Sequence, residues 1–133
     1  MTQFHGAELW LGDRSRSLAI PGAIAELLFV EGFWDHLRDA AGLDGYLFDQ
    51  WESDDIPLEV MGAIGAASRD YADRYGQEGT VTGVVRWVLD ANGNLVDKEP
   101  ASASAVEIRS TILSVAAFAD EALAKATSLF VSL

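Results

Sequence analysis

The spacing of apolar residues changes along this 133-residue chain, and this change limits the fold more than any other feature. Short runs with strand composition occur at both ends and near the middle, and stretches with helical spacing lie between them. Segments in this order predict an α+β domain, with a small antiparallel sheet packed against three to four helices. The length is that of one domain, so residues 1–133 are expected to form a single globular unit.

The first part of the chain is predicted to form a hairpin followed by helices. Ala7–Leu11 and Ser17–Ile20 flank a polar segment of turn type, which favours two antiparallel strands. Helical spacing then covers residues 21–41, and Gly32 is expected to break this stretch into two helices. Residues 43–51 have no clean period, so a short strand and an aromatic loop remain alternatives for them.

A further helix is predicted over residues 57–76. The Ser-Asp-Asp sequence at 53–55 offers side chains that cap a helix, and a proline follows where first-turn prolines occur. Gly62 and Gly65 lower the helix propensity of this stretch. Such small residues would allow another element to pack closely against the helix.

The next strands are ambiguous in period but not in composition. Residues 80–89 are mostly β-branched or aromatic, and the reverse-turn sequence at 90–94 connects them to residues 95–96. This arrangement predicts a second hairpin. Residues 97–104 are read as a polar linker that ends in capping residues.

The C-terminal part is predicted to be a long helix followed by a final strand. Apolar residues recur at helical spacing from Ala105 to about Ala126. Residues 127–133 are too apolar for a loose tail, so they are expected to pair within the sheet.

Acidic and aromatic residues are concentrated in residues 31–59. This segment holds nine acidic residues and one basic residue, so it accounts for eight of the twelve net negative charges of the chain. It also contains Phe33, Trp34, Tyr46, Phe48 and Trp51. Acids among large rings indicate a docking surface for a basic partner. The structural alternative is a solvated acidic face above rings that belong to the core.

The binding residues are predicted in the part of this segment outside any clear helix. Tryptophan and tyrosine on a loop can anchor an interface, and the acids around them would steer a basic partner toward it. The predicted binding residues are Asp44, Tyr46, Asp49, Trp51, Glu52, Asp54 and Asp55. For Asp54 and Asp55, the alternative is a structural role in the first turn of the following helix.

No motif predicts a catalytic residue, a metal site or a cofactor. The chain lacks cysteine, a nucleophile elbow, a phosphate-binding loop and a dinucleotide fingerprint. His36 stands between Asp35 and Asp39, but helical geometry directs the three side chains apart. The loops beginning at Asp44 and Asp90 lack the ligand spacing of a calcium loop. A role other than catalysis is therefore preferred.

Charge and hydropathy limit the partners and the compartment. A net charge of −12 disfavours direct binding to nucleic acid or to anionic lipid. The longest apolar stretch, residues 18–30, is too short to span a bilayer. The N-terminus lacks the pattern of a signal peptide, so a cytoplasmic location is expected.

In general character the chain resembles small bacterial immunity or inhibitor proteins, which are acidic, intracellular and bind a basic toxin enzyme. This resemblance implies a small acidic binding module that blocks a basic protein. One alternative is a small-ligand binding domain or enzyme, with a pocket between sheet and helices that uses Asp35, His36 or Tyr71. Another is a homo-oligomeric structural protein that associates through an exposed sheet edge.

Overall fold

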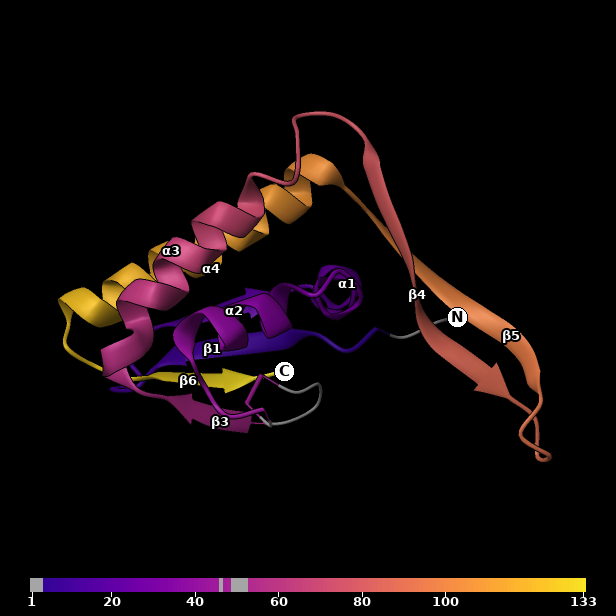
Figure 1. Ribbon diagram of the computed structural model, residues 1–133, viewed down its shortest axis with the longest axis horizontal. Coiled ribbons are helices and arrows are strands. Elements are labelled where there is room, and N and C mark those ends of the chain that lie inside the picture. The colour runs from indigo at the N-terminus through magenta and orange to yellow at the C-terminus, as the bar shows by residue number, and fades with distance from the viewer. Residues whose placement is uncertain (1–3, 46, 49–52) are drawn as a thin grey trace.

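A computed structural model describes residues 4–45, 47–48 and 53–133. These ranges contain four α-helices and two antiparallel sheets (Figure 1), which confirms the α+β class and the long C-terminal helix followed by a final strand. In chain order the elements are β1 (Ala7–Leu11), β2 (Ser17–Ile20), α1 (Gly22–Val30), α2 (Phe33–Ala41), β3 (Ser53–Ile56), the 3-10 turn η1 (Leu58–Val60), α3 (Met61–Ala72), β4 (Thr80–Leu89), β5 (Leu95–Ser104), α4 (Ala105–Ala124) and β6 (Leu129–Ser132).

The larger sheet has the strand order β2-β1-β6-β3, and every neighbouring pair is antiparallel. The predicted β1–β2 hairpin and the predicted final strand are both confirmed. β6 lies between β1 and β3, so the last strand of the chain is an inner strand of the sheet. Leu129 pairs with Leu11 on one side and with Ile56 on the other, and all three side chains are buried in the core.

The break between the first two helices lies at Gly32, as predicted. Its φ of +81° is in the left-handed region, which glycine adopts without the steric cost of a Cβ atom. The turn places Phe33 and Trp34 of α2 in the core, where Phe48 also lies. These three rings of the acidic segment are therefore core residues, as the structural alternative for them proposed.

α3 and α4 pack along each other, and Gly65 lies where they approach closely. A Cβ atom at Gly65 would lie 2.8 Å from Asp120 Oδ1 and 3.7 Å from the carbonyl oxygen of Ala116. The expected close packing is therefore found at Gly65. At Gly62 a Cβ atom would meet open space, so that glycine has no such role.

The predicted capping role of residues 53–55 is wrong. Ser53–Ile56 forms β3, and the helix begins later, at Met61, after η1. Asp54 and Asp55 are thus strand residues, and Val60 precedes α3 without a side-chain cap hydrogen bond. β6 has a second edge that requires a partner, and residues 53–56 supply it. This strand has a single buried apolar residue, Ile56, so its sequence lacks the alternation of apolar and polar residues that would predict a strand.

The predicted polar linker at residues 97–104 is also wrong, because these residues belong to β5. β4 and β5 form a separate two-stranded ribbon, residues 80–104 with its turn, which we call the arm. The arm extends away from the four-stranded sheet (Figure 1) and rests on α1 near its base. Gly83 and Ala101 face α1, and a Cβ atom at Gly83 would lie 2.9 Å from Val30 Cγ1.

An ion-pair network fixes the arm to α1. The pairing of β4 with β5 shifts between Val84 and Arg86, a bulge that lets Arg86 join Glu99 on the inner side of the ribbon. Arg86 Nη2 donates to Glu26 Oε1 at 2.6 Å, and Nη1 donates to Glu99 Oε2 at 3.2 Å. Glu26 is only 2% exposed, so Arg86 supplies the charge that compensates a buried carboxylate.

Replacing Arg86 with methionine should therefore destabilise the protein strongly. Removing one member of a buried pair leaves an uncompensated charge, and we expect a loss of about 3 kcal/mol or more in the free energy of unfolding, measured with urea. Arg16→Met is the control, because the Arg16–Glu121 pair is exposed and worth at most about 1 kcal/mol. Equal losses for the two variants would contradict the anchoring role, and Glu26→Gln in the Arg86→Met background should restore part of the stability.

Deleting residues 127–133 should abolish cooperative folding. The deletion removes β6, on which β1 and β3 both depend, together with buried Leu129, Val131 and Leu133. Each buried leucine alone is worth about 2–5 kcal/mol against a total stability of about 5–15 kcal/mol. Circular dichroism during heating should show no sigmoidal transition. An unchanged melting temperature would show that β6 is dispensable.

Candidate protein-binding surface

Three of the predicted binding residues lie in the described part of the chain. Asp44 is exposed in the connection after α2, Asp55 is exposed on β3, and Asp54 is half-buried on β3. The other four predicted binding residues lie outside the described residues: Tyr46, Asp49, Trp51 and Glu52.

β3 forms one edge of the four-stranded sheet. Within the described ranges it pairs with β6 alone, and Figure 1 shows it as the outermost strand on its side of the sheet. Backbone N–H and C=O groups along an unpaired strand edge are available to a strand of another protein. The side chains of Asp54 and Asp55 flank this edge. Charged side chains on an edge strand also discourage uncontrolled pairing between sheets.

The sheet has a second face, opposite the core, that carries an aromatic pair. Along β1 and β6 the buried residues alternate with Trp10 and Phe130, which are partly exposed. The register places Trp10 directly opposite Phe130, and Phe130 directly opposite Asp55. Directly opposed side chains on one face of a sheet lie close enough to interact. We call this face, with Trp10, Phe130 and Asp55 at its centre, the outer sheet face.

Trp10 and Phe130 were not among the predicted binding residues, although the sequence contains a signal for them. In the Ala-Glu-Leu-Trp-Leu and Leu-Phe-Val-Ser segments, period-two alternation separates these two rings from their leucine and valine neighbours. That alternation places the rings on the face opposite the core. Only the register of β1 with β6 shows that they adjoin each other and Asp55.

The β1–β2 loop adds a cation to the outer sheet face. The guanidinium carbon of Arg14 lies 4.3 Å from the centre of the Phe130 ring. Arg14 has a φ of +64°, and the preceding Asp13 accepts hydrogen bonds from the backbone N–H and the hydroxyl of Ser15. These bonds hold the pKa of Asp13 below its usual range. The loop therefore has a defined conformation that supports the stacked arginine.

The acids near β3 differ from those on the helices in their ion pairing. On α2, Asp35 and Asp39 both pair with Arg38, at 3.1 and 3.6 Å. In the described ranges no ion pair involves Asp44, Asp54 or Asp55. Their carboxylates are therefore not engaged in ion pairs within these ranges, and the nearest cation described on the outer sheet face is Arg14, stacked on Phe130.

The residues of the alternative ligand site serve the fold. Tyr71 is buried, and its hydroxyl donates a hydrogen bond to the backbone carbonyl of Glu31. The His36 ring packs on the Tyr71 ring, with 5.2 Å between the two centroids. The guanidinium group of Arg74 lies over the face of the Tyr71 ring. Burial raises the pKa of Tyr71 and, more strongly, that of Tyr75. None of these groups lines the surface hollows of α4 or the arm.

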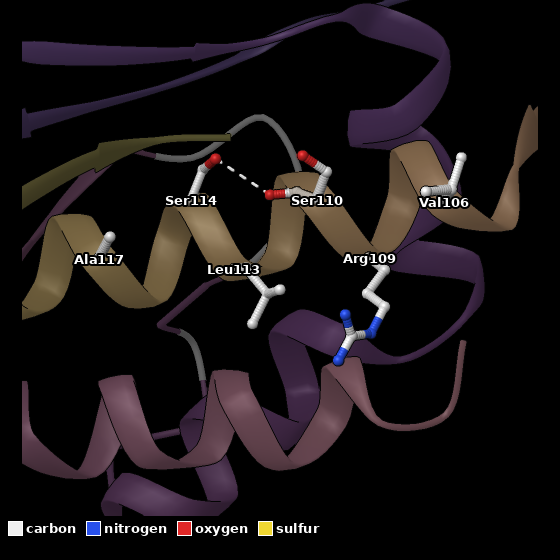
Figure 2. A pocket seen from close by; sticks show the side chains of 6 residues that line it. All are labelled: Val106, Arg109, Ser110, Leu113, Ser114 and Ala117. Atoms are coloured by element: carbon white, nitrogen blue, oxygen red, sulfur yellow. Dashed lines mark hydrogen bonds between the residues drawn. The ribbon is translucent and has the colours of Figure 1, made fainter. Parts of the chain in front are cut away.

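A hollow runs along the exposed side of α4 (Figure 2). It is lined by Val106, Arg109, Ser110, Leu113, Ser114 and Ala117. Arg109 and Leu113 point toward α3, whereas the two serine side chains point the other way. The Ser114 hydroxyl donates to the Ser110 carbonyl at 3.0 Å. Among the described residues, Ser114 and Ala117 also line a neighbouring hollow that contains Arg16 and Glu121.

The described residues contain no group of three or more histidine, aspartate or glutamate side chains arranged to hold a metal ion. No helix in these ranges is long and apolar enough to cross a membrane. Comparison of the chain with protein families, curated proteins and solved structures finds no match in any of the three. The functional assignment therefore depends on the surface geometry.

Ionisation of the buried tyrosines should destabilise the protein at alkaline pH. Because the folded state raises the pKa of Tyr71 and Tyr75, their stabilising contribution is complete below the unfolded value of about 10 and is lost as pH rises above it. We expect the free energy of unfolding in urea to stay level up to about pH 9 and to fall as pH rises above about 10. Tyr75→Phe should reduce this fall relative to the wild type. An identical pH dependence in the two proteins would show that ionisation of Tyr75 does not cause the loss of stability.

Proposed function

We propose that this protein is an acidic protein-binding module that holds a basic protein against its outer sheet face and the β3 edge. The observation that carries the proposal is the placement of Asp55 beside the Phe130–Trp10 pair on a partly exposed sheet face. Rings of this kind supply apolar contact area at the centre of an interface, and adjacent carboxylates select a partner of opposite charge.

Electrostatic attraction supports a basic partner. The chain carries a net charge of −12, and Asp44, Asp54 and Asp55 keep their charges uncompensated by ion pairs within the described ranges. Asp49 and Glu52 precede β3 in the sequence and add two acidic residues to this part of the chain. Such a field accelerates encounter with a basic protein more than it tightens the final complex.

The form of binding that we propose is blockade, as in an immunity or inhibitor protein. The edge of β3 that has no strand partner within the described ranges adds backbone donors and acceptors to the surface, so a strand of the partner could extend the sheet there. Binding of this type needs no catalytic group.

The test compares two variants that remove equal charge from different places. A tagged wild-type protein is used to capture partners from its native host, and the purified basic partner is then measured by stopped-flow kinetics. Asp54→Asn with Asp55→Asn should slow association several-fold at low salt, whereas Asp35→Asn with Asp39→Asn on α2 should slow it much less. Phe130→Ala should weaken affinity by about 2 kcal/mol, mainly through faster dissociation.

Three results would count against this function. One is a captured partner without excess basic charge, and another is a binding rate that does not change with added salt. The third is equal slowing by the two double variants, which would show that only the total charge matters and that the β3 edge is not the site. Circular dichroism of each variant must first show an unchanged fold, because Asp54 is half-buried.

A further inference from the structure

The end of the arm carries an apolar surface that the proposed binding site does not use. Trp87, Leu89, Leu95 and Val96 are 61%, 56%, 55% and 60% exposed. The other large apolar residues that are exposed in the described ranges lie apart from them, on α1 and α4. Contiguous exposed apolar residues on a small domain mark an interaction surface, whereas single ones do not.

The register of the arm explains why these side chains face solvent. Arg86 and Glu99 face α1 through the network with Glu26, so the adjacent Trp87 and Lys98 face the opposite side. Leu89 pairs with Leu95 next along the ribbon, close to the turn. Near the base of the arm α1 covers the inner side, and the far end of the arm extends beyond the helices (Figure 1).

The outer side of the arm also differs from the rest of this acidic chain in charge. Residues 80–104 are all described, and on their outer side the pairing register places Lys98 but no acid. Asp97 and Glu99 alternate with Lys98 in the pairing register, but Asp97 is exposed and lines the same hollow as Trp87, Leu95 and Lys98. Asp90 lies in the turn. At this end of the arm Lys98 and Asp97 offset each other, so the surface carries little net charge that would attract a basic protein. It is instead a surface on which two copies of an acidic chain can approach with little repulsion.

We propose that the outer side of the arm packs against the same surface of a second copy, forming a symmetric dimer. In such an isologous contact Trp87, Leu89 and Leu95 of each copy cover those of the other. The outer side of a ribbon with ten-residue strands covers roughly 300 Å², from about 3.3 Å per residue and about 10 Å of width. A standard interface buries about 800 Å² per partner, so the dimer should dissociate on dilution.

The proposed dimer contact and the proposed binding of a basic protein should respond to added salt in opposite directions. Two chains of net charge −12 repel each other over most of their surfaces, and salt screens that repulsion. Dimerisation should therefore strengthen with added salt, whereas association with a basic partner should weaken. The two interactions also use different residues, so one can fail without the other.

The experiment is sedimentation velocity over protein concentrations from about 10 µM to about 1 mM, in about 50 mM and about 500 mM NaCl. The wild type should pass from a 14.3 kDa monomer toward twice that mass as concentration rises, and at lower concentrations in the higher salt. Trp87→Glu places an acid at the centre of the contact and should weaken dimerisation at least tenfold. Leu95→Ser, which changes no charge, should weaken it as well.

The control is Leu123→Glu, which places an acid at an exposed leucine on α4 and should leave the dimer nearly unchanged. Circular dichroism verifies the fold of each variant, and Leu95→Ser decides the result if Trp87→Glu is unfolded. A wild type that stays monomeric at every concentration would overturn the proposal. Dimerisation that survives both arm variants, or that weakens with salt, would overturn it as well.

Discussion

The pairing of β6 on both of its edges is the interaction on which the rest of this structure depends. β6 is the last strand in the sequence, yet it joins β1 from the start of the chain to β3 from the middle. α4 spans the length of the core and returns the chain to the sheet at this position. Both strand edges of β6 are thereby satisfied, and Leu129 and Val131 complete the core. The outer sheet face exists only because this pairing sets Phe130 between Trp10 and Asp55.

A second constraint comes from a buried charge. Glu26 lies on α1, and the other residues of this helix are apolar. The buried carboxylate is tolerated there because Arg86 of the arm forms an ion pair with it. The bulge in β4 is what lets arginine face inward, so one local irregularity decides which side of the arm meets α1 and which side meets solvent. Because Arg86 faces inward, the next residue, Trp87, faces outward and is exposed.

The two surfaces described above differ in their electrostatic character. On the outer sheet face Asp55, which forms no ion pair within the described ranges, adjoins the Phe130 ring, and this is the surface that we propose binds a basic protein. At the end of the arm, apolar residues adjoin Lys98 and Asp97, so the surface that we propose pairs two copies carries little net charge. One small acidic domain can therefore present two distinct contacts without one competing with the other for the same partner.

The sequence by itself determined the elements whose signals are local. The turn at Gly32, the hairpin strands β1 and β2, the long helix α4 and the apolar final strand all follow from spacing, turn chemistry and composition. It also showed that Asp44, Asp54 and Asp55 belong to the most acidic part of the chain.

Tertiary structure alone decided which segments pair and which faces they expose. Asp54 and Asp55 became strand residues because β6 required a partner, and no local preference could reveal that requirement. β5 continued through a polar stretch because its neighbour β4 supplied hydrogen bonds along its length. The outer sheet face brings together Trp10, Asp55 and Phe130, residues separated by most of the chain. The register of the strands places these three side chains together, and register depends on long-range pairing. The local sequence pattern therefore could not predict the outer sheet face.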